Sequence, residues 1–374
     1  MEIGIVGLPN VGKSSLFNAL TGAGAAVANF PFTTIEPNIG VVPLPDDRLN
    51  VLSEKFASQK ITPAGIRFVD IAGLVKGASK GEGLGNKFLS HVRSVDAIAH
   101  VIRCFHDDNV VNVMQTLDPL SAVETIETEL LLADLQQAQK ALDKLKGPCQ
   151  AGEKSAREKF VFLEQLVAGF NQGKSARHQN NIPPEIIDEF QFLTAKPLLY
   201  VANTDERSER SERSEPGEQD NQNASSNQFI EPLRLRAQKD NARLVVLCTK
   251  LEAEIVQLPP EERALYYESV GITSPGLAAL AKAGQELLNL VCFFTTGPKE
   301  TRAWLIPRGT RAVKAAGKIH SDIERGFIRA EVYKYDDLVR LGNYKAVQEK
   351  GLVSLEGKDY EIQDGDVVYF RFSV

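Results

Sequence analysis

The chain has 374 residues, of which 43% are hydrophobic and 25% are charged, and its formal net charge is -6. These are ordinary values for globular proteins, and the length suits two or three domains. No apolar stretch approaches the roughly 20 residues of a membrane-spanning helix, and a net negative charge gives no support for broad binding to nucleic acid, so neither a membrane protein nor a DNA-binding protein is expected.

The N-terminus and the cysteines both favour a cytoplasmic protein. The chain enters an apolar run at Ile3, which leaves no room for a signal peptide. The four cysteines have neither disulfide nor metal-ligand spacing. We therefore expect reduced thiols and a cytoplasmic location.

A phosphate-binding loop follows the first predicted strand. Residues 7–14 are GLPNVGKS, which fills every required position of the motif G-x-x-x-x-G-K-[ST]. Residues 3–6 predict a buried strand, and residues 15–20 predict the start of a helix. In such a loop backbone N–H groups point at phosphate oxygens, Lys13 reaches the outer phosphates, and Ser14 offers its hydroxyl to Mg²⁺.

Two further segments are typical of nucleotide switches. Residues 66–69 predict a strand that runs into Asp70, and Gly73 completes a D-x-x-G turn. A carboxylate at this place can hold Mg²⁺, and a glycine N–H can sense a γ-phosphate. Thr34, in the segment 30–37, could complete the magnesium shell. On its own that segment equally fits a connection punctuated by prolines.

Several stretches resemble one known family. Residues 29–38 resemble the first switch of the Obg-related translation-factor GTPases, and residues 70–89 resemble the long glycine-rich second switch of the YchF subfamily. Residues 317–322, 327–330 and 364–368 resemble the C-terminal TGS module of that subfamily. The resemblance implies an α/β fold: a P-loop NTPase doubly wound parallel sheet, an inserted helical (coiled-coil) arm and a C-terminal β-grasp-like TGS domain.

The base-recognition motif departs from that of a GTPase. The predicted strand 198–202 leads into NTDE at positions 203–206, where a guanine-binding protein has N-K-x-D. Glu206 keeps the charge of the aspartate but adds a methylene, which shifts the geometry of two hydrogen bonds to guanine. The resemblance implies a preference for ATP, with GTP as the alternative. After the predicted strand 244–247, the backbone at Cys248 could touch the base from the other side.

The chain lacks the glutamine that orients the attacking water in Ras-like enzymes, because Leu74 follows Gly73. Backbone groups of the glycine-rich switch or a monovalent cation must then position the water. In potassium-stimulated relatives the equivalent of Asn10 helps to hold K⁺. Some YchF relatives use a loop histidine at a position that corresponds to Asn112, so a histidine mechanism is in doubt here.

These motifs define a predicted site. Its nucleotide-binding residues are Asn10, Val11, Gly12, Lys13, Ser14, Ser15, Asn203, Thr204, Glu206 and Cys248. Its catalytic residues are Lys13, Ser14, Thr34 and Gly73, and its Mg²⁺ ligands are Ser14, Thr34 and Asp70.

A helical insertion, 119–196, interrupts the nucleotide domain, which comprises 1–118 and 197–288. Apolar residues recur at helical spacing from Val123 to about Gly147, then again over 156–170 and 184–193. Helices packed on the core and an arm projecting toward a partner are equally compatible with the residues. The resemblance favours the arm.

The segment 206–228 predicts a flexible surface loop. It combines an S-E-R repeat with Gly, Asn, Gln and Ser, and such a composition cannot bury enough apolar area to offset its ordering entropy. Its arginines could bind RNA, but the equal share of glutamates favours a solvated loop.

The last segment, 289–374, predicts the TGS domain, with strands near 303–306, 329–332 and 367–372. Its first half is basic, through Arg302, Arg308, Arg311, Lys314, Lys318, Arg325 and Arg329. An RNA-contacting face and a solvated surface balanced by acidic residues both fit this pattern, and the resemblance favours RNA.

The predicted function is a nucleotide-dependent switch ATPase that uses Mg²⁺, with K⁺ as a further candidate cofactor, and that binds the ribosome, with the large subunit as the expected side. The alternative is a nucleotide-binding regulatory or stress-response protein whose hydrolysis is incidental.

Overall fold

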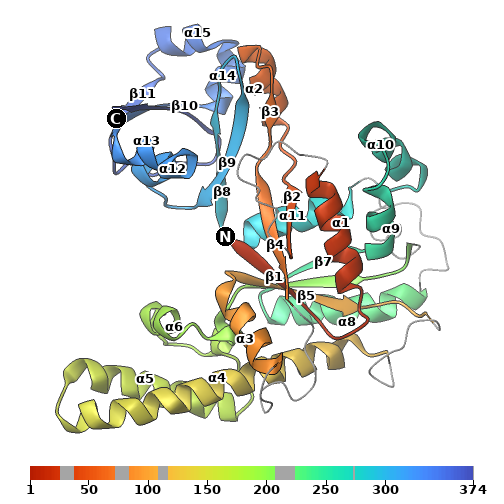
Figure 1. Ribbon diagram of the computed structural model, residues 1–374, viewed down its shortest axis with the longest axis vertical. Helices are drawn as coiled ribbons and strands as arrows, with labels where there is room; N and C mark the ends of the chain where they lie inside the picture. The colour runs from red at the N-terminus through yellow and green to blue at the C-terminus, as the bar shows by residue number, and fades with distance from the viewer. Residues whose placement is uncertain (26–37, 72–83, 108–116, 207–223, 273, 374) are drawn as a thin grey trace. The chain divides into compact units, whose positions relative to one another are not determined.

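The computed structural model describes residues 1–25, 38–71, 84–107, 117–206, 224–272 and 274–373 (Figure 1). These residues form two compact units. The first contains the described residues within 1–22, 38–40 and 67–280, and the second contains those within 23–25, 41–66 and 281–373.

A six-stranded sheet carries the nucleotide motifs. Its strands are β1 (Glu2–Val6), β2 (Ile39–Pro43), β4 (Gly65–Asp70), β5 (Ala97–Arg103), β6 (Leu198–Asn203) and β7 (Arg243–Leu247), in the order β2-β4-β1-β5-β6-β7. The pairings of β1 with β4 and β5, of β5 with β6 and of β6 with β7 are parallel. All of β5 is buried, as expected for a central strand covered on both faces.

The strand order places a ligand crevice at β1. Strands β4 and β5 lie on opposite sides of β1, although they are consecutive strands of this sheet along the chain. Such a reversal opens a crevice at the carboxyl ends of the strands, where open α/β sheets bind ligands. The phosphate loop leaves β1 at this end.

Five of the described helices outside the insertion lie wholly or mostly in the first unit. They are α1 (Lys13–Ala25), α3 (Leu84–Ser94), α8 (Ala224–Lys239), α9 (Thr249–Ile255) and α10 (Pro260–Ser269). Helix α11 (Gly276–Leu287) begins in the first unit and continues into the second. Helix α8 begins at Ala224, so residues 224–228, predicted as the end of the flexible loop, are helical. The buried side chains of Ile230 and Leu233 hold this helix in place. Residues 207–223 of the predicted loop lie outside the described residues.

The insertion contains two long helices and three short ones. They are α4 (Pro119–Gln150), α5 (Lys154–Asn171), η1 (Ala176–His178), α6 (Pro184–Phe190) and η2 (Leu193–Ala195). The side chain of Asp118 caps α4 by accepting from the N–H of Leu120 at 3.1 Å. Helices α4 and α5 lie side by side (Figure 1), and Leu131, Leu163 and Phe170 share one buried apolar cluster.

Helix α4 is buried along only part of its length. The buried residues of this helix run from Pro119 to Ala138, and the half beyond Ala138 has no fully buried side chain. The helix also continues to Gln150, past the predicted end at Gly147. Its first half therefore packs on the core, and its second half extends with α5.

A buried carboxylate fixes the end of the insertion. Asp134 of α4 accepts hydrogen bonds from the backbone N–H groups of Leu193 and Thr194, both at 2.8 Å, and from the Thr194 hydroxyl at 2.7 Å. Burial raises the pKa of Asp134, and these hydrogen bonds oppose the rise. The carboxylate thus holds η2 just before the chain returns to β6.

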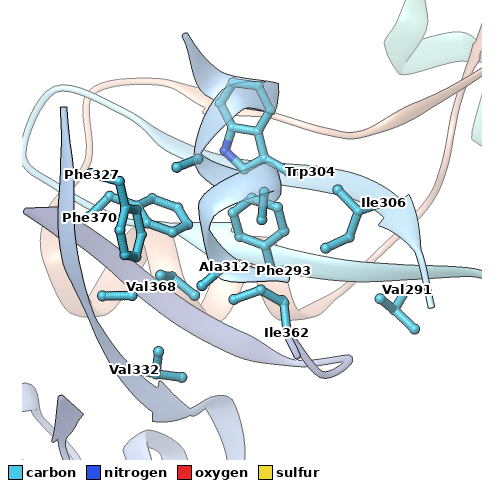
Figure 2. Close-up of a cluster of buried hydrophobic side chains, with 13 residues drawn as sticks. Val291, Phe293, Trp304, Ile306, Ala312, Phe327, Val332, Ile362, Val368 and Phe370 are labelled. Atoms are coloured by element: carbon cyan, nitrogen blue, oxygen red, sulfur yellow. The ribbon is translucent and has the colours of Figure 1, made fainter. Parts of the chain in front are cut away.

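The second unit contains a mixed sheet. Its strands are β3 (Ile61–Thr62), β8 (Leu290–Thr295), β9 (Thr301–Pro307), β10 (Phe327–Lys334), β11 (Ser354–Glu356) and β12 (Asp366–Phe372), in the order β11-β10-β12-β8-β9-β3. Its helices are α2 (Arg48–Phe56), α12 (Ala312–Ile319), α13 (Ser321–Arg325), α14 (Tyr335–Leu341) and α15 (Tyr344–Glu349). Figure 2 shows one buried cluster, in which the Phe293 and Trp304 rings stack at 6.3 Å and Phe370 meets Phe293 edge-on.

Residues 41–66, expected in the nucleotide domain, belong to this second unit. Leu49 and Leu52 of α2 are buried in a cluster with Phe294. Strand β3 pairs in parallel with β9, and Arg48 donates to Asp364 at 2.8 Å. These contacts join segments that are far apart in the chain, so no local sequence pattern predicts them.

Two expectations about composition can be compared with the structure. None of the helices in the described part of the chain is long and apolar enough to cross a membrane. None of the four cysteines, all of which lie in the described ranges, forms a disulfide, and Cys104, Cys248 and Cys292 are buried in or directly after strands.

Candidate nucleotide site

The phosphate loop has a backbone that its glycines make possible. Gly12 has a φ of 97°, and a Cβ there would lie 2.2 Å from the Asn203 Nδ2 and 2.9 Å from the Thr249 Oγ1. Asn10 also has a positive φ, of 61°, which asparagine tolerates better than most residues. The loop therefore packs closely against the ends of β6 and β7.

Lys13 and Asp70 form the charged centre of the site. The ammonium of Lys13 donates to the carbonyls of Gly7 at 2.9 Å and Leu8 at 2.7 Å. Burial lowers the pKa of Lys13, while the charge of Asp70 raises it. Burial raises the pKa of Asp70, and the charge of Lys13 opposes the rise. The two groups are therefore close enough to stabilise each other's charged forms.

Asn203 joins three segments of the site. Its Nδ2 donates to the carbonyl of Val11 at 2.9 Å, and its Oδ1 accepts from the N–H of Thr249 at 3.0 Å. The residue is 2% exposed. Thr204 is also 2% exposed, and its hydroxyl has no hydrogen-bond partner among the described residues.

These segments surround a hollow of about 760 Å³. Nine of the ten predicted nucleotide-binding residues line it, among them Asn10, Gly12, Lys13, Ser14, Ser15, Thr204 and Glu206. Asn203 and Cys248 also line it, whereas Val11 is 5% exposed and takes part through its carbonyl. The volume lies within the range of small-molecule sites.

The sequence-based prediction missed one wall of this hollow, which Phe105, His106 and Asp107 form. These residues come directly after β5, whose carboxyl end lies beside that of β1. A signal was therefore present, because the carboxyl ends of parallel strands meet at one edge of the sheet.

Arg103 holds this wall in place. Its Nε donates to the carbonyl of Phe105 at 3.2 Å, and its Nη2 donates to the carbonyl of Asp107 at 3.0 Å. Its guanidinium also lies 4.7 Å from the centre of the Phe105 ring. On the other side, the ring of His106 lies 5.4 Å from that of Phe229 in α8.

Four residues of the predicted mechanism are not placed. Thr34, Gly73, Leu74 and Asn112 lie outside the described residues. In the part of the chain that is described, no group of three or more His, Cys, Asp or Glu side chains could hold a metal ion. Ser14 and Asp70 are therefore the Mg²⁺ candidates that can be examined.

A glycine-rich loop between a central parallel strand and a helix, facing a hollow at the switch point of the sheet, defines a P-loop nucleotide-binding protein. A family model described as a 50S ribosome-binding GTPase matches residues 2–136, and a model for the C-terminal domain of YchF GTPases matches residues 290–373. The chain belongs to the YchF family.

Relatives match the chain over its whole length. It is 47% identical to the ribosome-binding ATPase YchF of Bacillus subtilis, covering 100% of both chains. It is 46% identical to the protein of the same name from Haemophilus ducreyi, covering 100% of this chain and 99% of the relative. The solved YchF GTPase of Schizosaccharomyces pombe is 32% identical, with a TM-score of 0.85 over 99% of this chain and 97% of that chain. The predicted fold class and family are confirmed.

Proposed function

We propose that this chain is an ATP hydrolase whose nucleotide state controls its association with the ribosome. One observation carries the proposal: the phosphate loop, tied to Asn203, borders a hollow whose base side contains Thr204 and Glu206 in place of a guanine-reading motif. The chain also matches, from end to end, proteins named ribosome-binding ATPases.

Lys13 and Ser14 would act on the phosphates. Lys13 is held by two neutral carbonyls, and an anionic phosphate oxygen is a stronger acceptor for its ammonium. Ser14 and Asp70 fit a Mg²⁺ ion, because both offer oxygen ligands. Ser14 lines the hollow, and the Asp70 carboxylate lies near Lys13 at the end of β4. Such an ion neutralises charge on the outer phosphates. Thr34 and Gly73 would complete the metal shell and sense the γ-phosphate.

The residues on the base side of the hollow favour binding of adenine and do not form a guanine-specific site. Glu206 lines the hollow where a guanine reader has a shorter aspartate, and Thr204 replaces the lysine that packs across the base. Asn203, Thr204, Glu206 and Cys248 would therefore surround the base without the two-bond guanine contact. GTP remains a weaker alternative substrate.

A monovalent cation would help to position the attacking water. Asn10 lines the hollow beside the phosphate loop, and Leu74 cannot donate or accept a hydrogen bond through its side chain. K⁺ is the cation that the family resemblance implies at Asn10. Turnover should therefore be faster in potassium than in sodium salt.

The partner would be the large ribosomal subunit, met in the cytoplasm. The description of the matched model, 50S ribosome-binding GTPase, supports this choice. A purely regulatory protein with incidental hydrolysis would not need the ribosome for rapid turnover. No feature of the described residues favours that alternative.

The test is ATP turnover measured alone and with purified ribosomes or separated subunits. The proposal predicts that ribosomes stimulate hydrolysis, that the large subunit suffices, and that the ATP form cosediments better than the ADP form. If ribosomes do not change the turnover, and the nucleotide does not change the cosedimentation, the regulatory alternative is favoured.

A further inference from the structure

A groove separate from the nucleotide hollow lies where α3 meets the insertion. It has a volume of about 640 Å³ and is lined from α3, α4 and α6. We call it the arm groove. The residues of the arm groove that matter here are Ser90, Arg93, Gln136, Lys140, Lys144 and Glu189. Figure 1 shows α3 beside α4, near the base of the insertion.

The arm groove carries uncompensated positive charge. Within the described part of the chain, Arg93, Lys140 and Lys144 make no ion pair with a carboxylate, although the buried Asp134 feels the charge of Arg93. Among the described residues that line the arm groove, the one carboxylate is Glu189, and Lys159 binds it at 2.7 Å. This local excess of cations stands out in a chain whose net charge is -6.

The basic half of the C-terminal segment differs, because three of its seven named cations are paired with carboxylates. Arg311 pairs with Asp359 at 2.8 Å, and Lys314 pairs with Glu324 at 2.6 Å. Arg325 pairs with Asp322. The basic residues of the C-terminal segment are therefore partly neutralised, whereas Arg93, Lys140 and Lys144 of the arm groove are not paired with any carboxylate that the structure describes.

We propose that the arm groove binds the phosphate backbone of RNA. Lysine, arginine, serine and glutamine side chains are the usual donors to nucleic-acid phosphates, and all four types line the arm groove. Lys140 and Lys144 lie one helical turn apart, about 6 Å along α4, so they can neutralise phosphates that follow one another on a strand. Leu89, Leu145 and Phe190 add an apolar part to the lining, to which an acidic protein segment could also bind, but the cations left unpaired among the described residues favour a phosphate backbone.

This proposal rests on the proposed ribosome association and names the surface that makes the RNA contact. It also predicts a specific salt dependence. Each lysine that contacts a phosphate releases a counterion, so its loss should lower the slope of log affinity against log salt by roughly one.

The test compares two double variants. Lys140→Gln/Lys144→Gln removes two cations of the arm groove, and Lys146→Gln/Lys154→Gln removes two cations outside it that already pair with Asp143 and Glu158. All four lysines are exposed, so both variants should fold. Binding is measured to intact ribosomes and to deproteinised ribosomal RNA from the same ribosomes, over a series of salt concentrations.

The arm-groove variant should lose about ten-fold or more in RNA affinity at 0.1 M salt and about two units of slope, and the control variant should change little. Equal losses in both variants, or no loss in the arm-groove variant, would overturn the proposal. Weaker ribosome binding with unchanged RNA affinity would assign the arm groove to an acidic protein instead. If the wild-type chain fails to bind ribosomes at all, the proposed function itself fails.

Discussion

The side chain of Asn203 donates to the backbone carbonyl of Val11 at 2.9 Å, which ties the end of β6 to the phosphate loop. The same side chain accepts from the N–H of Thr249 after β7. One buried amide therefore holds together the phosphate side and the base side of the hollow. Most of what we expect of this site depends on that link.

Replacing Asn203 should weaken nucleotide binding without removing a group that contacts the phosphates. Asn203→Ala leaves the Thr249 N–H and the Val11 carbonyl without their partner, and each lost buried hydrogen bond costs about 1–3 kcal/mol. We expect at least a ten-fold weaker affinity for ATP, measured by calorimetry. Asn203→Asp keeps the acceptor but loses the donor to Val11, so it should also bind more weakly than wild type. Wild-type affinity in both variants would show that the link has no role in binding.

Lys13 and Ser14 should be needed for hydrolysis. Lys13→Ala or Ser14→Ala should reduce ATP turnover by about 100-fold or more, because removing one preorganised electrostatic contact to a transition state costs that much. Leu74→Ala should leave substantial activity, since a leucine cannot orient water. A severe loss in Leu74→Ala with normal turnover in Lys13→Ala would reverse the proposed roles.

Arg103 should act as a positioning residue for the wall formed by Phe105 and Asp107. Arg103→Lys keeps the charge but cannot reproduce both backbone hydrogen bonds and the contact with the Phe105 ring. We expect KM for ATP to rise about ten-fold, equivalent to ~1.4 kcal/mol, with little change in kcat. The matched control is Arg234→Lys, on an exposed part of α8. A fall in kcat at constant KM would assign Arg103 a different role.

His100 should make the sheet less stable in acid. It is 2% exposed in β5, and burial lowers its pKa from 6.5 to about 3. The folded chain therefore keeps His100 neutral while the unfolded chain takes up a proton, so stability falls as the pH drops from 6.5 toward 3. Between pH 6.5 and pH 5 the loss from this one group should be about 2 kcal/mol.

Hydrogen exchange of peptides from β5 measures this effect. Protection should fall more steeply with acid in the wild-type chain than in His100→Gln, which has no group that titrates in this range. The same pH dependence in both chains would mean that other groups cause it.

The sequence predicted those parts of the site that local motifs encode. The phosphate loop, Asp70 and the segment 203–206 each follow a short apolar run, and each such run is a strand of one sheet. The wall at Phe105 carries no motif, so only its place at the end of β5 could have indicated it. Arg103 could not be foreseen, because its role depends on two backbone carbonyls that the fold brings within reach.

The remaining differences come from long-range pairing. Residues 41–66 look locally like part of an alternating α/β domain, yet Leu49 and Leu52 are buried with Phe294. The basic residues near Arg311 look like a free cationic face, yet Asp359 and Glu324 neutralise two of them. Such partners are distant in the sequence, so composition alone could not reveal them.

The most direct test of the account is an affinity series for ATP, GTP and their diphosphates in the presence of Mg²⁺. Thr204 and Glu206, in place of the guanine-reading lysine and aspartate, predict that ATP binds at least as tightly as GTP. A GTP affinity ten-fold better than that for ATP, about 1.4 kcal/mol, would contradict the account.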